Sequence, residues 1–329
     1  MAWPTPAWLD ALPPGPAYAV NHPLAPETTI QVGGPAQVWA PCGTWAQVAA
    51  LRAFATAHSI PFTLLGKGSN MVVADGGIGG LVVPLGKGCD AVRVEGTTLY
   101  AEAGAATGTA ARAAREAGLA GLAFFGGIPG SVGGALRMNA GAYGHETFDA
   151  VTEVVLLDAQ GQTVVKPPSF VQPRYRGTTL PEGWLYQAAR WHLQPGDKEQ
   201  IRQQMREINQ ARSTSQPLHL PSSGSWFKNV PVTAENLAML ERIHPGVAVG
   251  GVVNAWRVVA AAGCRGLREG GAQVSEQHCN FFVNLGLKEG QSATAAEFDR
   301  LSARVEAAVL AKFGLVLQRE VRFVGEGAA

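Results

Sequence analysis

The segment LLGKGSNMVV, residues 64–73, carries the first pattern of residue types that could do chemistry. Gly66 and Gly68 would let backbone amides approach an anion, and the side chains of Ser69 and Asn70 would add hydrogen bonds. The pattern matches neither a G-x-G-x-x-G fingerprint before a helix nor a P-loop. The segment therefore predicts either a phosphate-binding loop or an ordinary glycine turn between two strands.

A second, longer glycine-rich segment covers residues 121–144 and is too rich in glycine for an ordinary helix. A flat ligand such as a pyrophosphate with an isoalloxazine ring could lie against its main-chain amides. Close packing of two backbone segments would also explain the glycines. Two such segments in one α+β lobe favour a bound dinucleotide. The positions expected to contact it are Gly66, Lys67, Gly68, Ser69, Asn70, Ile128, Pro129, Gly130, Ser131, Gly133, Gly134, Ala135, Asn139 and Gly141.

The composition limits the functions that these segments can serve. Hydrophobic residues make up 47% and charged residues 16% of the 329 residues, which indicates an ordered protein of two or three packed units. Lys and Arg number 26 against 25 Asp and Glu, so no basic excess predicts binding to nucleic acid or to a membrane. Without a signal peptide or a long apolar stretch, the protein is expected in the cytoplasm. The four cysteines lack disulfide or zinc spacing and are expected to be buried or incidental thiols.

The elements that must position these segments alternate short strands with helices up to about residue 197. Thr44 is expected to cap a helix whose apolar residues repeat at helical spacing. Residues 61–65 and 81–85 predict short buried strands. A second helix is expected near residues 107–117, and residues 151–165 predict a hairpin.

Beyond a domain boundary near residue 197, the run of short strands is expected to stop. Helices are expected there, one with Ile201, Met205 and Ile208 on one face, and a long amphipathic one that ends at Gly314. A last strand, at about residues 315–325, is expected to close the active site.

Six motifs then follow one another along the chain. They are GKGSN, IPGSVGG with MNAGAYG, RYRGT (174–178), GSWFKN (224–229), GGAQVSEQHCNFFVN (270–284) and QREVRFVG (318–325). In this order they resemble the signature segments of the UDP-N-acetylenolpyruvoylglucosamine reductase family, and TTIQVGGPA at 28–36 resembles its N-terminal element. The resemblance spans roughly residues 21–325, and six ordered motifs do not arise together by chance.

The resemblance implies an α+β fold with two parts. Residues 1–197 would form a flavin-binding lobe of two α+β subdomains of the vanillyl-alcohol oxidase type, and residues 198–329 a separate α+β substrate-binding domain. NADPH would reduce non-covalently bound FAD and leave, and UDP-N-acetylglucosamine enolpyruvate would then be reduced to UDP-N-acetylmuramate for peptidoglycan synthesis. The implied partners are these small molecules, with no obligate protein partner.

The resemblance also assigns roles to single residues. Ser225 matches the proton donor, Arg176 the catalytic arginine and Glu320 the catalytic glutamate. Hydride addition at C3 of the enolpyruvyl group gives a carboxylate-stabilised enol, which a guanidinium can hold with two hydrogen bonds. Without the motif order, the three would read as a turn or cap serine, a solvated loop charge and an edge-strand carboxylate. The matching substrate-binding positions are Tyr175, Lys228, Asn229 and Gln273, of which Lys228 could equally be a surface lysine.

Some positions depart from the family pattern. Lys67 stands where glycine is more frequent, and Gln318-Arg319 stand where Glu-Pro is commoner. No long insertion with an extra tyrosine precedes residue 197, which indicates the shorter-loop subtype. Cys264, Cys279 and His278 lie near the motifs but are expected to be packed thiols and a solvated imidazole.

Two other functions remain open from the residues alone. A flavin lobe could serve an FAD-linked oxidase, or the chain could be an inactive module that binds a UDP-sugar or nucleotide. Colour separates them, because a yellow protein bleached by NADPH excludes the binding module and slow reoxidation by oxygen disfavours the oxidase.

Overall fold

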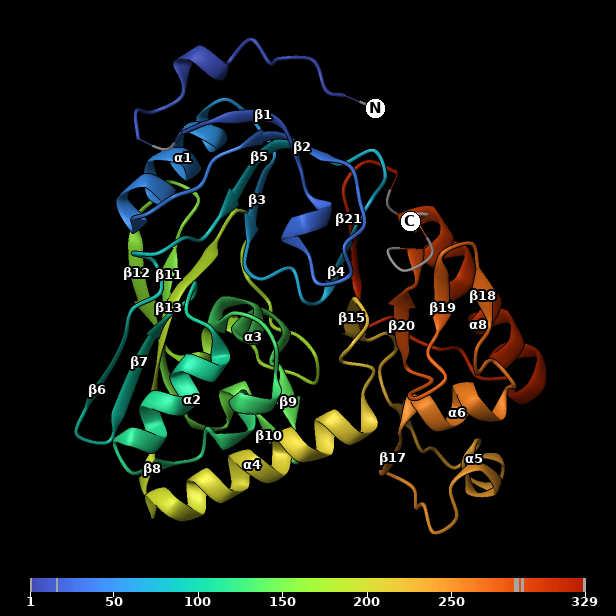
Figure 1. The fold of residues 1–329 in the computed structure, drawn as a ribbon. Helices are drawn as coiled ribbons and strands as arrows, with labels where there is room; N and C mark the ends of the chain where they lie inside the picture. Colours follow the sequence, from blue (N-terminus) through green and yellow to red (C-terminus); the bar gives the residue numbers. More distant parts are fainter. Residues whose placement is uncertain (1, 16, 287–289, 291–292, 328–329) are drawn as a thin grey trace. The chain divides into compact units, whose positions relative to one another are not determined.

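The computed structural model describes residues 2–15, 17–286, 290 and 293–327, which form two compact units (Figure 1). The units are discontinuous along the chain. The first comprises Met1–His22, Pro35–Lys67 and Gly79–Arg212, and the second comprises Pro23–Gly34, Gly68–Ile78 and Ser213–Ala329. The assignment of residues 1–197 to the flavin and of residues 198–329 to the substrate also concerns ligands, and it stays a prediction.

The first unit contains two larger sheets, each with its own hydrophobic core. The strand orders are β1-β2-β5-β3, in which β3 and β5 are parallel, and β12-β11-β13-β7-β6, whose pairs are antiparallel. The elements of the two sheets and their helices are β1 (Ala19–Pro23), β2 (Pro35–Trp39), α1 (Trp45–Ala57), β3 (Phe62–Leu65), β5 (Ile78–Pro84), β6 (Val92–Glu95), β7 (Thr98–Glu102), α2 (Thr107–Glu116), α3 (Val132–Met138), β11 (Val151–Leu157), β12 (Thr163–Lys166), β13 (Leu185–His192) and α4 (Lys198–Ser215). Two sheets with two cores agree with the expected pair of α+β subdomains.

Local sequence accounts for most of these elements. The Thr44 hydroxyl accepts a hydrogen bond from the Gln47 amide and begins α1, as expected of a threonine cap. The hairpin predicted for residues 151–165 is confirmed as β11 and β12, and the predicted helix at residues 107–117 is confirmed as α2. Helix α4 carries the predicted Ile201 face. Cap chemistry and apolar spacing therefore predicted these elements correctly.

The glycine-rich segment of residues 121–144 contains more regular structure than we expected. A short helical turn, Ala123–Gly127, precedes α3, and two glycines lie inside α3. Ser131 caps α3 by accepting a hydrogen bond from the Gly134 amide, and Asn139 ends it in the left-handed conformation with φ of 41°. The two caps stabilise a seven-residue helix against the entropic cost of its glycines.

The second unit is built around a four-stranded sheet, so the expectation that strands stop after residue 197 is wrong. Its strand order is β15-β20-β19-β18, and the pairs are antiparallel. The unit's elements are β4 (Met71–Val73), β15 (Ser222–Ser225), β16 (Val230–Pro231), α5 (Leu237–Ile243), β17 (Val252–Val253), α6 (Ala255–Ala261), β18 (Arg268–Glu269), β19 (Ala272–Val274), β20 (Phe281–Asn284), α8 (Ala295–Phe313) and β21 (Arg322–Val324). These strands have two to four residues, too few for an alternating pattern to emerge in the sequence.

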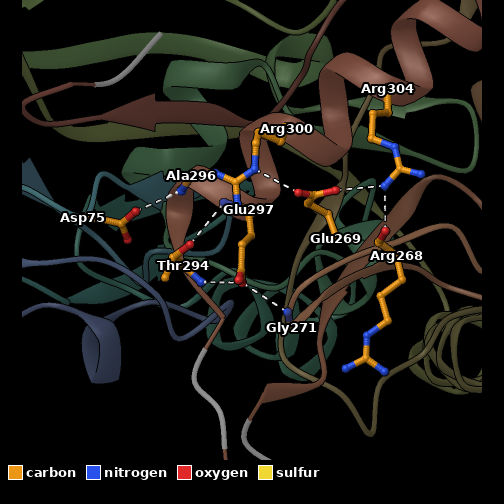
Figure 2. Close-up of polar contacts among 9 residues, drawn as sticks. All are labelled: Asp75, Arg268, Glu269, Gly271, Thr294, Ala296, Glu297, Arg300 and Arg304. Atoms are coloured by element: carbon orange, nitrogen blue, oxygen red, sulfur yellow. Dashed lines mark hydrogen bonds and ion pairs between the residues drawn. The ribbon is translucent and has the colours of Figure 1, made fainter.

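Helix α8 begins at an elaborate cap, which Figure 2 shows. Thr294 and Glu297 form a capping box, and the Glu297 carboxylate also accepts a hydrogen bond from the Gly271 amide. The carboxylate of Asp75, far away in sequence, accepts from the amide of Ala296 in the first turn. Negative charge at a helix N-terminus is favourable, so the cap attaches α8 to two other segments of its unit. Gly314 ends the helix with φ of 67°, as predicted.

The last predicted strand is shorter than expected. Within residues 315–325 only β21 (Arg322–Val324) forms a strand, and Arg319 forms an isolated bridge with Phe227. Strand β21 pairs in parallel with β4, which follows the GKGSN segment, and so joins positions about 250 residues apart in the sequence. Among the described residues, no helix combines the length and the apolar character needed to cross a membrane.

Candidate active site

Within the first unit, the backbone of Gly66 lies against the side chain of Ser131. A β-carbon on Gly66 would collide with the hydroxyl of Ser131, the residue that caps α3. Gly66 and Lys67 are themselves exposed. The structure therefore brings together the start of the predicted phosphate loop and the N-terminal end of α3.

Neighbouring glycines in α3 have different surroundings. A β-carbon on Gly133 would lie 2.7 Å from the β-carbon of Ala103, so glycine is required there by packing within the protein. Gly134 is exposed, and a β-carbon would meet only the Ser131 hydroxyl at 3.5 Å, an ordinary contact distance. Close packing thus explains Gly133, whereas nothing in the described chain explains Gly134.

Asn139 is buried and organises the end of α3. Its amide donates to the Glu146 carboxylate at 2.6 Å and to the Arg174 carbonyl at 3.3 Å, and its side-chain oxygen accepts from the Phe148 amide. Asparagine tolerates the left-handed conformation better than most residues do. Asn139 is therefore satisfied by protein groups and shapes the loop that contains Gly141.

Arg176 lies in a two-residue turn between Arg174 and Gly177, with φ of 56°. Its guanidinium donates to the Gly141 carbonyl at 3.0 Å, lies 4.7 Å from the Tyr175 ring centroid and is 3.9 Å from a Glu146 oxygen. The side chain is only 17% exposed, so its interpretation as a solvated loop charge is wrong. Such a backbone conformation costs free energy, so the contacts around Arg176 must hold the residue in it.

Asn70, at the end of the GKGSN segment, lies beside the segment that contains Glu320. The Asn70 amide donates to the Glu320 carbonyl at 3.3 Å, and the Asn70 carbonyl accepts from the Arg322 amide at 3.1 Å. Both bonds belong to the junction of β4 and β21. Parallel pairing in the second unit thus brings the first motif next to the last one.

Ser225 ends β15 and is followed by a tightly bonded segment. Ser225 pairs with Phe281 of β20, and the next residue, Trp226, accepts a hydrogen bond from the Glu320 amide at 2.8 Å. The Asn280 side chain is bonded to both backbone groups of Phe227, at 2.9 and 2.8 Å. Ser225 and Glu320 therefore lie on segments that are hydrogen-bonded to each other.

Sequence reasoning noted Arg319 only as a departure from the family pattern and assigned no role to Asn280 or Glu146. The side chains of Asn280 and Glu146 hydrogen-bond the site segments, and that of Arg319 hydrogen-bonds Asp299 and Glu306 of α8. Asn280 and Arg319 both lie inside quoted motifs, QHCNFFVN and QREV, so their polar types next to apolar runs were the available signal. A side chain that hydrogen-bonds a backbone group distant in the sequence produces no spacing pattern that could reveal it. Glu146 follows the last glycine-rich motif without any such signal.

The predicted substrate-binding residues have different surroundings. The Asn229 side chain accepts from the Ala255 amide at the start of α6, and the Gln273 amide donates to the Gly266 carbonyl at 3.4 Å. The Lys228 backbone amide donates to the Gln318 carbonyl, while Tyr175 is 44% exposed. Asn229 and Gln273 thus have structural partners.

The predicted catalytic and substrate-binding residues divide between the two units. Tyr175 and Arg176 belong to the first unit, whereas Ser225 and Glu320 belong to the second. The remaining substrate positions, Lys228, Asn229 and Gln273, also belong to the second unit. The GKGSN segment itself is divided, because Gly66 and Lys67 belong to the first unit and residues 68–70 belong to the second.

The titratable side chains near these motifs are packed. Burial lowers the pKa of His278, whose ring contacts Phe281 and Trp256, so the expected solvated imidazole is wrong. Cys264 and Cys279 are buried, as expected, and burial raises the pKa of both thiols. In the parts of the chain that the structure describes, no group of three or more His, Cys, Asp or Glu side chains could hold a metal ion.

Comparison with known proteins agrees with both units. Residues 36–165 match the family model described as "FAD binding domain", and residues 216–324 match "UDP-N-acetylenolpyruvoylglucosamine reductase, C-terminal domain". The two matched ranges together cover most of the chain and leave residues 166–215 between them.

Relatives match over nearly the whole chain. The UDP-N-acetylenolpyruvoylglucosamine reductase of Azorhizobium caulinodans is 40% identical and covers 98% of each chain, and that of Parvibaculum lavamentivorans is 39% identical and covers 98% of this chain and 96% of the relative. The crystal structure of the Thermus caldophilus reductase aligns with a TM-score of 0.73 at 30% identity, covering 94% of this chain and 98% of that one. The expected α+β fold and the expected family are confirmed. The chain belongs to the UDP-N-acetylenolpyruvoylglucosamine reductase family.

Proposed function

We propose that the protein uses NADPH and bound FAD to reduce UDP-N-acetylglucosamine enolpyruvate to UDP-N-acetylmuramate. The observation that carries this proposal is the match of both the FAD-binding and the reductase domain, together with about 40% identity over 98% of the chain. The reaction supplies a precursor for peptidoglycan, and hence for cell-wall biogenesis, cell shape and division. The enzyme works on small molecules in the cytoplasm, without an obligate protein partner, nucleic acid or membrane.

The glycine-rich segments fit FAD. The exposed backbone of Gly134 has space above it that no described side chain fills, and Gly66 meets Ser131 at the capped end of α3. Amides without side chains are the groups that a pyrophosphate binds. The residues that would hold the cofactor are therefore those of the segments 66–70 and 128–141, with no covalent attachment.

Bound FAD supplies the capacity to accept a hydride from NADPH and to deliver one to the substrate. The chain's own residues must then hold the carboxylate and deliver a proton. The Arg176 guanidinium is positioned by Gly141 and Tyr175, and its planar fork suits a carboxylate that gains negative charge as C3 of the enolpyruvyl group is reduced. We assign carboxylate binding to Arg176.

Ser225 would protonate C2 of the enolpyruvyl group, and Glu320 would act on the carboxyl end of the same group. Ser225 lies at the end of β15. Its hydroxyl can deliver a proton to C2 because the carbanion-like carbon is a much stronger base than the serine alkoxide that is left. Glu320, on the segment bonded to Trp226, would hydrogen-bond the carboxyl end of the enolpyruvyl group. Lys228, Asn229, Gln273 and Tyr175 would bind the rest of the UDP-sugar.

An anaerobic titration tests the function directly. The purified holoprotein should be yellow, should lose the visible absorbance of its flavin with one equivalent of NADPH, and should regain it when the enolpyruvyl substrate is added. Release of flavin by acid denaturation would confirm non-covalent binding. A colourless protein would favour a binding module, and rapid reoxidation by oxygen without response to the enolpyruvyl substrate would favour an oxidase.

A further inference from the structure

Arg319 forms ion pairs with Asp299 and Glu306, and it directly precedes Glu320. Its Nε donates to Glu306 Oε1 at 2.6 Å, and one terminal nitrogen donates to the other Glu306 oxygen at 3.2 Å. The second terminal nitrogen donates to Asp299 Oδ1 at 2.5 Å. Arg319 thus binds two carboxylates of α8, one of them with a two-pronged contact.

This arrangement differs from an ordinary surface ion pair. The Arg319 side chain is 24% exposed. Arg300 and Arg304 of α8, which pair with Glu269 of β18 (Figure 2), have side chains that are 56% and 48% exposed. Burial lowers the pKa of Arg319, but the hydrogen bonds to Glu306 and Asp299 outweigh it and raise the pKa overall. Exposed single ion pairs contribute little to the free energy of unfolding. A half-buried bidentate ion pair also fixes the relative positions of its two side chains.

The backbone on both sides of Arg319 is bonded to the segment that follows Ser225. The Lys228 amide donates to the Gln318 carbonyl at 2.8 Å, and the Glu320 amide donates to the Trp226 carbonyl at 2.8 Å. Arg319 lies between these two bonds and is bridged to Phe227. Any shift of Arg319 would therefore be passed to the backbone of Glu320.

Trp226 is anchored to the same helix. Its ring nitrogen donates to the Ser302 hydroxyl at 2.7 Å, and its ring is stacked on Phe298 and Phe282. Asp299, Ser302 and Glu306 follow one another at spacings of three and four residues, so they lie on one face of α8. One helix face thus holds both segments that carry the proposed catalytic residues of this unit.

We propose that Arg319 is a positioning residue of the reductase. Its hydrogen bonds to Asp299 and Glu306 fix Glu320 beside the segment that begins at Ser225. The inference rests on the proposed function, because it needs Glu320 to act in the reaction.

The two half-reactions test the proposal. In Arg319→Ala holoenzyme we expect the reduction of flavin by NADPH at the parent rate, and reoxidation by the enolpyruvyl substrate slowed about 10- to 100-fold, as small misplacements of reacting groups cause. In steady state, kcat should fall more than the KM for either substrate rises. Arg319→Lys keeps the charge without the fork and should recover only part of the rate.

A double-mutant cycle locates the effect. Glu306→Gln should also slow reoxidation. The double variant Arg319→Ala, Glu306→Gln should be no slower than Arg319→Ala alone, because both substitutions remove the same interaction. Arg300→Gln, which removes an exposed ion pair of α8, is the matched control and should leave both half-reactions at the parent rate. If Arg319→Ala fails to fold, Arg319→Lys and Glu306→Gln carry the same test.

Different results overturn different claims. Reoxidation of Arg319→Ala at the parent rate, or an equal loss in both half-reactions, overturns the positioning role. Additive effects in the cycle do so as well. Failure of the parent enzyme to respond to the enolpyruvyl substrate overturns the proposed function itself, which is why the parent is measured first.

Discussion

The glycine-rich segment around α3, in the first unit, and the Ser225 segment, in the second, are held in place by opposite means. Around α3, missing side chains bring backbones together, as where Gly133 faces Ala103. Around Ser225, large or charged side chains reach a helix, as Trp226 reaches Ser302 and Arg319 reaches Glu306. In the proposed function, the first region would bind the cofactor by exposed amides, and the second would position Ser225 and Glu320.

The difference predicts how each region fails. A backbone surface tolerates almost no added atoms, so it should fail by steric overlap and lose its ligand. A site positioned by side-chain anchors should keep its ligand and lose rate, because its groups remain present but move. The following substitutions test that contrast, from the largest expected effect to the smallest.

Gly133→Val should have the largest effect. The added side chain would overlap Ala103 and strain α3, at a cost of about 1–3 kcal/mol in unfolding free energy, and should displace the segments expected to hold FAD. The protein should purify with little or no flavin, measured by absorbance and by thermal unfolding. A yellow, normally stable variant would contradict the packing argument.

Ser225→Ala should separate the half-reactions. NADPH should still bleach the protein at close to the parent rate, while reoxidation by the enolpyruvyl substrate should slow by about 10²–10⁴-fold, the usual effect of removing a general acid. Ser225→Cys retains a donor and should recover part of the rate. If Ser225→Ala reoxidises as fast as the parent, the proton comes from another group.

Arg176→Lys should lower kcat more than it weakens substrate binding. Lysine keeps the charge but loses the planar fork that the Gly141 carbonyl and Tyr175 hold in place, so a loss of about 10-fold or more in kcat is expected. Steady-state kinetics measures both parameters. A change confined to KM would make Arg176 a binding residue only.

Gly134→Ala should have the smallest effect on the protein and a selective one on the cofactor. The added methyl group has room next to Ser131, so thermal stability of the flavin-free protein should stay within about 0.5 kcal/mol of the parent. The dissociation constant for FAD, measured by flavin fluorescence, should rise about 10-fold if the amides of α3 contact the cofactor. An unchanged affinity would place the flavin elsewhere and would remove the contrast with Gly133.

The sequence by itself determined the family and the local elements. Caps at Thr44 and Gly314, and the hairpin at residues 151–165, follow from chemistry within a few neighbouring residues. The ordered motifs, each a run of consecutive residues, named the residues of the candidate site. Their catalytic roles stay predictions.

Only the tertiary structure decided what those motifs meet. The strands of the second unit were missed because they have two to four residues, and because every residue of β20 is buried and so shows no alternation. The contact of Asn70 with Glu320 depends on parallel pairing between β4 and β21, which no local pattern encodes. Likewise, Gly133 and Gly134 are the same residue type in adjacent positions, and only their neighbours in space distinguish a packing requirement from an open backbone.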